Sequence, residues 1–402
     1  MYNYLKAISF VAAVGASANT VRSPSGTSLS SDLLTGFGSH PQVLESTGGK
    51  AICVQGNVDV QASALGVQLN YPNPANQSVV TETVVEFLQD NSKIAEQVGG
   101  PTKTISGTYS ISVRLCFPKA KPYSNSVQIL THGIGFDKSY WDVATGFSYV
   151  DAAASDGSIT FLYDRLGIGL SDHPDPIQVV QTGLEVAIVH ELTQLLRNGA
   201  FAKISFSKVT GIGHSFGSVI SIGQTVFYPT DLDGVVLTGV SINTTGLVPF
   251  VSGLNVAIAA ENDPSRFQGL PSGYFVGDSS ISNQFAFLRL PNFPPQNLEI
   301  AETTKQTATF GELFTITSVI EPALNYTGAV FVVNGANDIP FCDGDCTFPS
   351  DKAAQVLLLY PFAASGSTSY LVPGTGHGIN LHYTAESAYS KIISFLTAQG
   401  LS

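Results

Sequence analysis

From residue 126 onward the chain repeats one pattern: a short apolar run, a glycine-rich or polar turn, and a stretch with helical spacing. The apolar runs are 127–130, 159–163, 209–212, 235–237, 329–333 and 369–372. Helical spacing is clearest over 178–198, where apolar residues fall on one side. Strand and helix in alternation predict an α/β fold with a mostly parallel sheet flanked by helices. Ligands bind at the carboxyl ends of such strands, so residues that follow these runs are candidate site residues.

Before residue 126 the pattern of apolar and polar residues is different. Residues 50–72 and 104–118 alternate apolar and polar side chains, which predicts an antiparallel extension at one edge of the sheet, with a helix near 80–97 between them. Residues 19–45 are rich in Ser, Gly and Thr and are expected to form an irregular leader. The leader and these strands make up a predicted N-terminal unit, 19–125.

A segment rich in Phe and Pro, 242–326, interrupts the alternation. A helix is predicted from about 297 to 320. A long insertion between two sheet strands is expected to cover the active-site end as a helical cap, which divides the core into 126–241 and 327–402. The aromatic residues of the cap could line an apolar substrate pocket, although most are expected to form its own small core. They are Phe250, Phe267, Tyr274, Phe275, Phe285, Phe287 and Phe293.

The N-terminus has the pattern of a signal peptide. Lys6 precedes an apolar stretch, 7–14, and the small residues 15–18 form a cleavage pattern. We expect residues 1–18 to be removed and the protein to be secreted; a buried first helix is the alternative. The apolar stretch is shorter than the roughly 20 residues of a membrane-spanning helix, and no later segment offers an uninterrupted span.

The four cysteines, an even number, suit an oxidising compartment. Of three possible pairings we favour Cys53–Cys116 and Cys342–Cys346. The first two cysteines lie in strand-like runs and the last two share a short loop. Zinc binding at 342–346 is the weaker alternative, because no His and no second close Cys pair lies nearby.

The charge of the chain limits which partners it can bind. The formal net charge is −12, and the 18 Lys and Arg residues form no run, which argues against a nucleic-acid partner and favours a small neutral substrate. Asn76, Asn243 and Asn325 begin possible N-glycosylation sequons. The oligomeric state is not predicted by any feature of the sequence.

The strongest candidate for chemistry is Ser215, in the string Gly-His-Ser-Phe-Gly that follows the run 209–212. Glycines two residues either side of a serine, between a strand and a helix, are typical of a nucleophile elbow, a turn that presents the serine hydroxyl. The string alone has low specificity, because the chain contains 39 glycines. A base and an acid are therefore required elsewhere.

Both partners follow later apolar runs. His377 lies in a glycine-rich turn after the run 369–372, and Asp338 follows the run 329–333 through the short segment 334–337. A histidine steadied by a carboxylate is the usual base that activates a serine. Asp343 and Asp345 are alternatives for the acid. The alternative bases are His132, His173, His214 and His382, the last expected on the following helix.

The order Ser, Asp, His on an alternating strand and helix pattern resembles the α/β-hydrolases. Segment 131–135 resembles the His-Gly loop of that family, and segment 163–172 resembles a structural turn after the next strand. This resemblance covers about 125–240 and 327–400. It implies an oxyanion hole formed by the backbone N–H groups of Ile134 and Phe216, with no cofactor and no metal. The likeness is greatest to uncharacterised secreted hydrolases of fungi.

The predicted activity is that of a secreted serine hydrolase, which transfers an acyl group from Ser215 to water. The favoured substrates are esters, thioesters or lactones of small to medium apolar acids. Three alternatives stay open: a lyase or acyltransferase with the same triad, a peptidase, and a non-catalytic secreted binding protein. A serine at the elbow argues against epoxide hydrolases and haloalkane dehalogenases, which place an aspartate there.

Overall fold

The structure is a computed structural model that describes residues 31–402, except 122 and 244. The predicted signal peptide, 1–18, lies outside the described residues. Within them no helix has both the length and the apolar character needed to cross a membrane.

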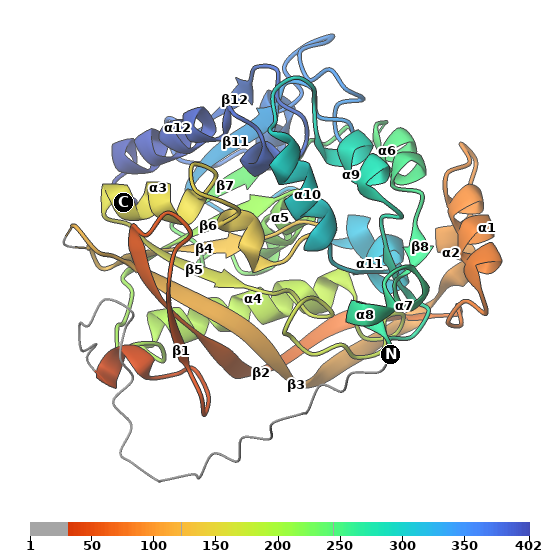
Figure 1. Ribbon diagram of the computed structural model, residues 1–402, viewed down its shortest axis with the longest axis horizontal. Coiled ribbons are helices and arrows are strands. Elements are labelled where there is room, and N and C mark those ends of the chain that lie inside the picture. Colours follow the sequence, from red (N-terminus) through yellow and green to blue (C-terminus); the bar gives the residue numbers. More distant parts are fainter. Residues whose placement is uncertain (1–30, 122, 244) are drawn as a thin grey trace, which may run out of the picture.

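A nine-stranded sheet forms the centre of the molecule, in the order β1-β2-β3-β5-β4-β6-β7-β11-β12 (Figure 1). The six strands from β5 to β12 are parallel, and β1, β2 and β3 are added antiparallel at one edge. All six apolar runs of the sequence are strands of this parallel part. The strands are β1 (Gln42–Glu45), β2 (Ala51–Leu69), β3 (Gly99–Pro118), β4 (Ser126–Thr131), β5 (Ile159–Tyr163), β6 (Lys208–His214), β7 (Gly234–Thr238), β11 (Ala329–Gly335) and β12 (Thr368–Val372).

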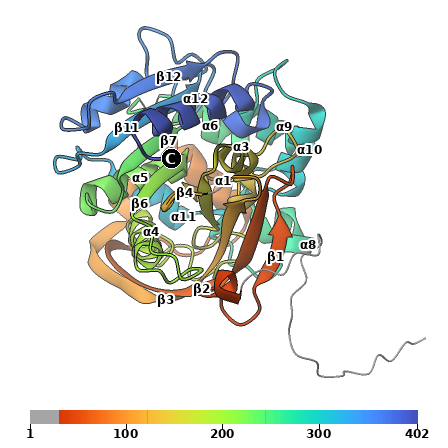
Figure 2. The same ribbon diagram turned by 90° about the vertical axis from the view of Figure 1, so that its left-hand side faces the viewer.

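Helices cover both faces of the parallel strands, which explains why β4, β5, β7 and β11 are buried along their whole length. Helices α4 (Thr182–Arg197) and α5 (Phe216–Phe227) pack on one face, and α3 (Tyr149–Asp156) and α12 (Ala385–Ala398) on the other (Figure 2). The observed α/β-hydrolase architecture is the predicted one.

The N-terminal unit is more regular than its composition indicates. Strands β2 and β3 pair from Ala51 opposite Pro118 to Leu69 opposite Gly99, and Cys53 is disulfide-bonded to Cys116. The expected irregular leader is partly wrong, because β1 lies within it. The single helix expected near 80–97 is also wrong: α1 (Gln77–Phe87) and α2 (Ile94–Val98) are separate, and Ser92 Oγ accepts the N–H of Ile94 at the start of α2.

Segment 242–326 contains helices and also a small antiparallel sheet, β10-β9-β8. The continuous helix expected from 297 to 320 is wrong. A capping box between Thr309 and Glu312 starts a new helix within that range. The elements are α6 (Leu247–Leu254), β8 (Ala257–Ile258), α7 (Ala259–Asn262), α8 (Pro264–Phe267), β9 (Tyr274–Val276), α9 (Ser280–Phe287), α10 (Pro295–Thr303), β10 (Ala308–Thr309), α11 (Phe310–Thr315) and the 3-10 turn η3 (Ile316–Val319). Of its seven candidate aromatics, only Phe285 is exposed.

Candidate active site

Ser215 occupies a strained turn between β6 and α5. Its backbone has φ 55° and ψ −121°, a conformation that costs a non-glycine residue on the order of 1–3 kcal/mol. The flanking glycines make the turn possible: a Cβ on Gly217 would lie 2.1 Å from the carbonyl oxygen of Thr131, and one on Gly213 would lie 2.6 Å from the Cα of Ser218. The elbow geometry expected from the sequence is therefore present.

Three predicted site residues form one hydrogen-bonded chain. Ser215 Oγ lies 2.8 Å from His377 Nε2, and His377 Nδ1 lies 2.6 Å from Asp338 Oδ2. Asp338 and His377 are buried, and Ser215 is 8% exposed. With the carboxylate accepting from Nδ1–H, Nε2 carries the lone pair that accepts the serine proton.

The loop after β11 holds Asp338 in place. Its second carboxylate oxygen, Oδ1, accepts the N–H of Phe341 at 2.9 Å, and the N–H of Gly344 donates to its carbonyl. The disulfide Cys342–Cys346 closes the loop, as predicted from the sequence. With both sulfurs bonded to each other, the zinc alternative at 342–346 does not apply. Within the described part of the chain, no group of three or more His, Cys, Asp or Glu residues is arranged to hold a metal ion.

The alternative acids lie outside this hydrogen-bonded chain. Asp343 and Asp345 are both exposed. Asp345 Oδ1 accepts hydrogen bonds from Thr347, whose hydroxyl and N–H lower the pKa of that carboxyl. Of the three carboxylates considered, the structure joins only Asp338 to His377.

Aromatic rings from segment 242–326 surround the imidazole of His377. The ring of Phe287 stacks on it with centroids 6.0 Å apart, and that of Phe250 meets it edge-on at 5.8 Å. The carbonyl of Phe287 also accepts the N–H of Gly378 at 2.8 Å. Because residue 378 has no side chain, these contacts steady the imidazole instead.

The other candidate bases have structural roles. His214 stacks on Tyr140 with centroids 4.4 Å apart, and burial lowers its pKa well below the usual range, which keeps it neutral. His173 lies against Tyr274. The expectation that His382 lies on the following helix is wrong: it ends the short turn η5 (Ile379–Leu381), before α12 begins.

The two proposed oxyanion donors lie on loops that meet at Ser215. Phe216 is the first residue of α5, whose N-terminal end carries partial positive charge. The loop that carries Ile134 is close to the serine, since a Cβ on Gly133 would lie 2.8 Å from Ser215 Cβ. Segment 242–326 braces this loop, because the N–H of Gln306 donates to the carbonyl of Gly135 at 3.0 Å.

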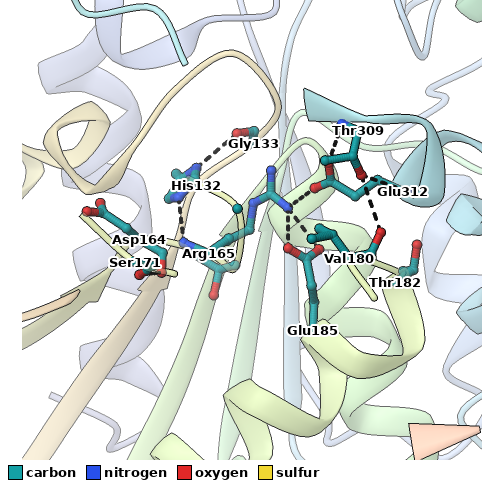
Figure 3. Close-up of polar contacts among 12 residues, drawn as sticks. His132, Gly133, Asp164, Arg165, Ser171, Val180, Thr182, Glu185, Thr309 and Glu312 are labelled. Carbon is teal, nitrogen blue, oxygen red and sulfur yellow. Dashed lines mark hydrogen bonds and ion pairs between the residues drawn. The ribbon is translucent and has the colours of Figure 1, made fainter. Parts of the chain in front are cut away.

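A buried ionic network that the sequence did not predict joins Arg165 to Glu185 and Glu312 (Figure 3). The Arg165 guanidinium donates to both oxygens of Glu185 at 2.8 Å and also to Glu312. It lies over the ring of Phe216, 4.6 Å from the centroid. The backbone N–H of Arg165 donates to His132 Nε2 at 3.1 Å.

This network links three parts of the chain: α4 through Glu185, α11 through Glu312, and the loop that carries His132. His132 Nδ1 donates in turn to the carbonyl of Gly133, and burial lowers the pKa of His132 well below its usual range. The Thr309–Glu312 capping box is the only local signal that could have drawn attention to Glu312. Nothing local marks Arg165 as its partner.

A cavity of about 580 Å³ reaches His377. Its walls come from α9 and the residues after it and from the loop between Asn337 and Gly344, which follows β11. Most of its lining is apolar, with Arg289 and Asp343 as charged residues. A volume of this size falls in the usual range of small-molecule sites.

Comparison with known proteins identifies the family of this chain. The model of the alpha/beta hydrolase family matches residues 128–388, which is more than half of the chain. The chain therefore belongs to the alpha/beta hydrolase family. No curated protein sequence matches it.

Several solved structures resemble this chain at low sequence identity. A thermophilic esterase from Thermogutta terrifontis is 13% identical, with a TM-score of 0.51, over 73% of this chain and 94% of that one. A carboxylesterase structure from the ammonia-oxidising thaumarchaeon Nitrososphaera gargenis is 13% identical, with a TM-score of 0.49, over 73% of this chain and 96% of that one. An alpha/beta hydrolase fold protein from Chitinophaga pinensis is 18% identical, with a TM-score of 0.48, over 72% and 94%.

Proposed function

We propose that this protein is a secreted serine hydrolase that cleaves an ester, thioester or lactone of a small to medium apolar substrate through an acyl-enzyme on Ser215. Membership of the alpha/beta hydrolase family supports hydrolase chemistry. The observation that carries the proposal is the hydrogen-bonded chain from Ser215 through His377 to Asp338. The two disulfides and the N-terminal apolar stretch support secretion.

In the first half of the reaction His377 Nε2 takes the proton of Ser215 as Oγ attacks the substrate carbonyl carbon. Asp338 stabilises the imidazolium that forms. The N–H groups of Ile134 and Phe216 stabilise the oxyanion, and removal of one such donor typically costs about a hundredfold or more in kcat. His377 then protonates the leaving-group oxygen, and the acyl group stays on Ser215.

In the second half a water molecule gives its proton to His377 and attacks the acyl carbon. Collapse of this second oxyanion breaks the bond to Ser215 Oγ, which regains its proton from His377. Segment 242–326 acts as the cap in this proposal, because Phe250 and Phe287 shield the imidazole from one side. No cofactor takes part in these steps.

A fluorophosphonate probe with peptide mass spectrometry tests the proposal. We expect one labelled peptide, modified at Ser215, and no label in Ser215→Ala. Labelling should be accompanied by hydrolysis of p-nitrophenyl esters. A folded protein that is not labelled would instead be a binding protein, and a labelled protein that cleaves peptides or transfers acyl groups without hydrolysing esters would belong to the alternative activities.

A further inference from the structure

Phe287 separates two cavities of very different size. The cavity of about 580 Å³ lies on the His377 side of this residue. A second cavity, of about 10 Å³, is lined on the other side by residues that include Ile134, Gly135, Leu254, Val256 and Phe275. The second volume is about that of a single water-sized sphere, so it accepts one small group without rearrangement.

The position of the Phe287 ring explains this separation. It stacks on the imidazole of His377, and its Cζ lies 3.3 Å from the point where a Cβ on Gly135 would be. It therefore spans the space between the histidine and the loop that carries Ile134. Phe136 and Phe250 pack against it with centroids 4.8 and 5.7 Å away, and it is 2% exposed.

The chemistry of acyl transfer decides which part of a substrate enters each cavity. The leaving-group oxygen must receive a proton from His377 Nε2, so the alcohol part lies on the histidine side. The carbonyl oxygen points to the N–H groups of Ile134 and Phe216. With the alcohol part and the carbonyl oxygen so placed, we assign the acyl carbon chain to the side of the loop that carries Ile134, which lines the small cavity.

We propose that the enzyme selects esters that join a short acyl group, of acetyl size, to a bulky apolar alcohol, and that Phe287 sets the limit on the acyl group. The walls of the larger cavity suit such an alcohol, because the side chains of Ile281, Phe285, Leu288 and Ile339 are apolar. This inference rests on the proposed function, since it assigns roles to the two sides of the same Ser215.

Two ester series test the selectivity on the wild-type protein. In the first, p-nitrophenyl acetate, butanoate and octanoate vary only the acyl group; kcat/KM should fall at least tenfold from acetate to octanoate. In the second, ethyl, butyl and octyl acetate vary only the alcohol, with leaving groups of similar acidity; kcat/KM should rise at least tenfold. A preference for octanoate over acetate, or for ethyl over octyl acetate, overturns the inference.

Variants of two phenylalanines on α9 identify the residue responsible. Phe287→Ala should raise the octanoate-to-acetate ratio of kcat/KM at least tenfold, and Phe287→Leu should raise it less; a ratio unchanged in both overturns the role of Phe287. The matched control is Phe285→Ala. In the wild-type protein the side chain of Phe285 is 47% exposed and lines only the larger of the two cavities. Phe285→Ala should leave the acyl ratio unchanged and weaken the preference for octyl acetate.

Failure of this inference and failure of the proposed function would give different experimental results. If Ser215 is labelled and esters are cleaved with the opposite selectivity, only this inference fails. If folded protein is neither labelled nor active on any ester of either series, the proposed function fails, and the inference fails with it.

Discussion

The imidazole of His382 accepts a hydrogen bond from the backbone N–H of Gly376, with 3.1 Å between Nε2 and N. The same nitrogen accepts the N–H of Arg289 at 2.9 Å, and Nδ1 donates to the carbonyl of Gly378 at 2.8 Å. One neutral imidazole therefore fixes both neighbours of His377 and joins them to the chain just after α9. Burial lowers the pKa of His382 to about 4.

Stability should depend on pH through this histidine. Its folded pKa of about 4 lies below the ordinary value of 6.5, so the unfolded chain takes up the proton first as pH falls. The stabilisation is fully present above pH 6.5, decreases between pH 6.5 and 4, and is absent below pH 4. Its size is up to about 3 kcal/mol. Urea unfolding from pH 4 to 8 measures it.

A variant separates His382 from the buried His132 and His214, whose lowered pKa values act in the same direction. His382→Gln should flatten part of this pH dependence and lower kcat, since Gly376 and Gly378 lose their partner. The matched control is His40→Gln at an exposed position, which should change neither quantity. An unchanged pH slope in His382→Gln would contradict the assignment.

Asp338→Asn should lower kcat by about 10³- to 10⁴-fold, because an amide no longer stabilises the imidazolium or enforces the tautomer with Nδ1–H. Folding should be preserved, because Asn has nearly the same shape. The control is Asp343→Asn, an exposed residue with φ 57°, a conformation that Asn tolerates well. Stopped-flow or steady-state hydrolysis of p-nitrophenyl acetate measures both. A large loss of kcat in Asp343→Asn would indicate that Asp343 is the catalytic acid instead of Asp338.

One disulfide should matter mainly for stability and the other mainly for activity. Replacement of Cys53 and Cys116 by Ser opens a long loop and should cost about 4 kcal/mol of unfolding free energy, with kcat unchanged. The same change at Cys342 and Cys346 should cost only about 2 kcal/mol but lower kcat several-fold, since it frees the turn that holds Asp338. Chemical unfolding and esterase assays on both double variants distinguish these effects.

Arg165→Met should destabilise the fold by about 3–5 kcal/mol at pH 8, because Glu185 and Glu312 are left buried without a counter-ion. The loss of unfolding free energy relative to wild type should be smaller at pH 5 than at pH 8, because buried carboxylates without a counter-ion take up protons more readily at the lower pH. The control is Lys203→Met, which removes an exposed ion pair with Asp32 and should cost less than about 1 kcal/mol. Equal losses for Arg165→Met at both pH values would contradict the buried-charge explanation.

The parallel core was predictable because its signals are local. Each strand reads as an apolar run that ends in a turn, and Ser215, Asp338 and His377 all follow such runs. The glycines around Ser215 report a backbone requirement directly, since Gly217 packs against the carbonyl of Thr131. Two of the three side chains come from loops, but their offsets from the strands were sufficient to select them.

What the sequence did not predict depends on contacts between distant segments. The role of His382 requires that its ring meet the N–H of Arg289, 93 positions away. The partners of Arg165 come from α4 and α11, and no spacing rule connects them. Likewise, Phe287 was one of seven candidate aromatics, and it is distinguished by contacting both His377 and the loop that carries Ile134.

The pairing of β3 with β5 has a consequence for how this chain can be shortened. The family match begins at residue 128, after β3, so a fragment cut to that match would lose the whole ribbon of β1, β2 and β3. Strand β5, which is buried at every position, would then become an exposed edge strand with unpaired backbone N–H and C=O groups. Such a fragment would self-associate through that edge, so expression of residues 128–388 alone would give aggregates.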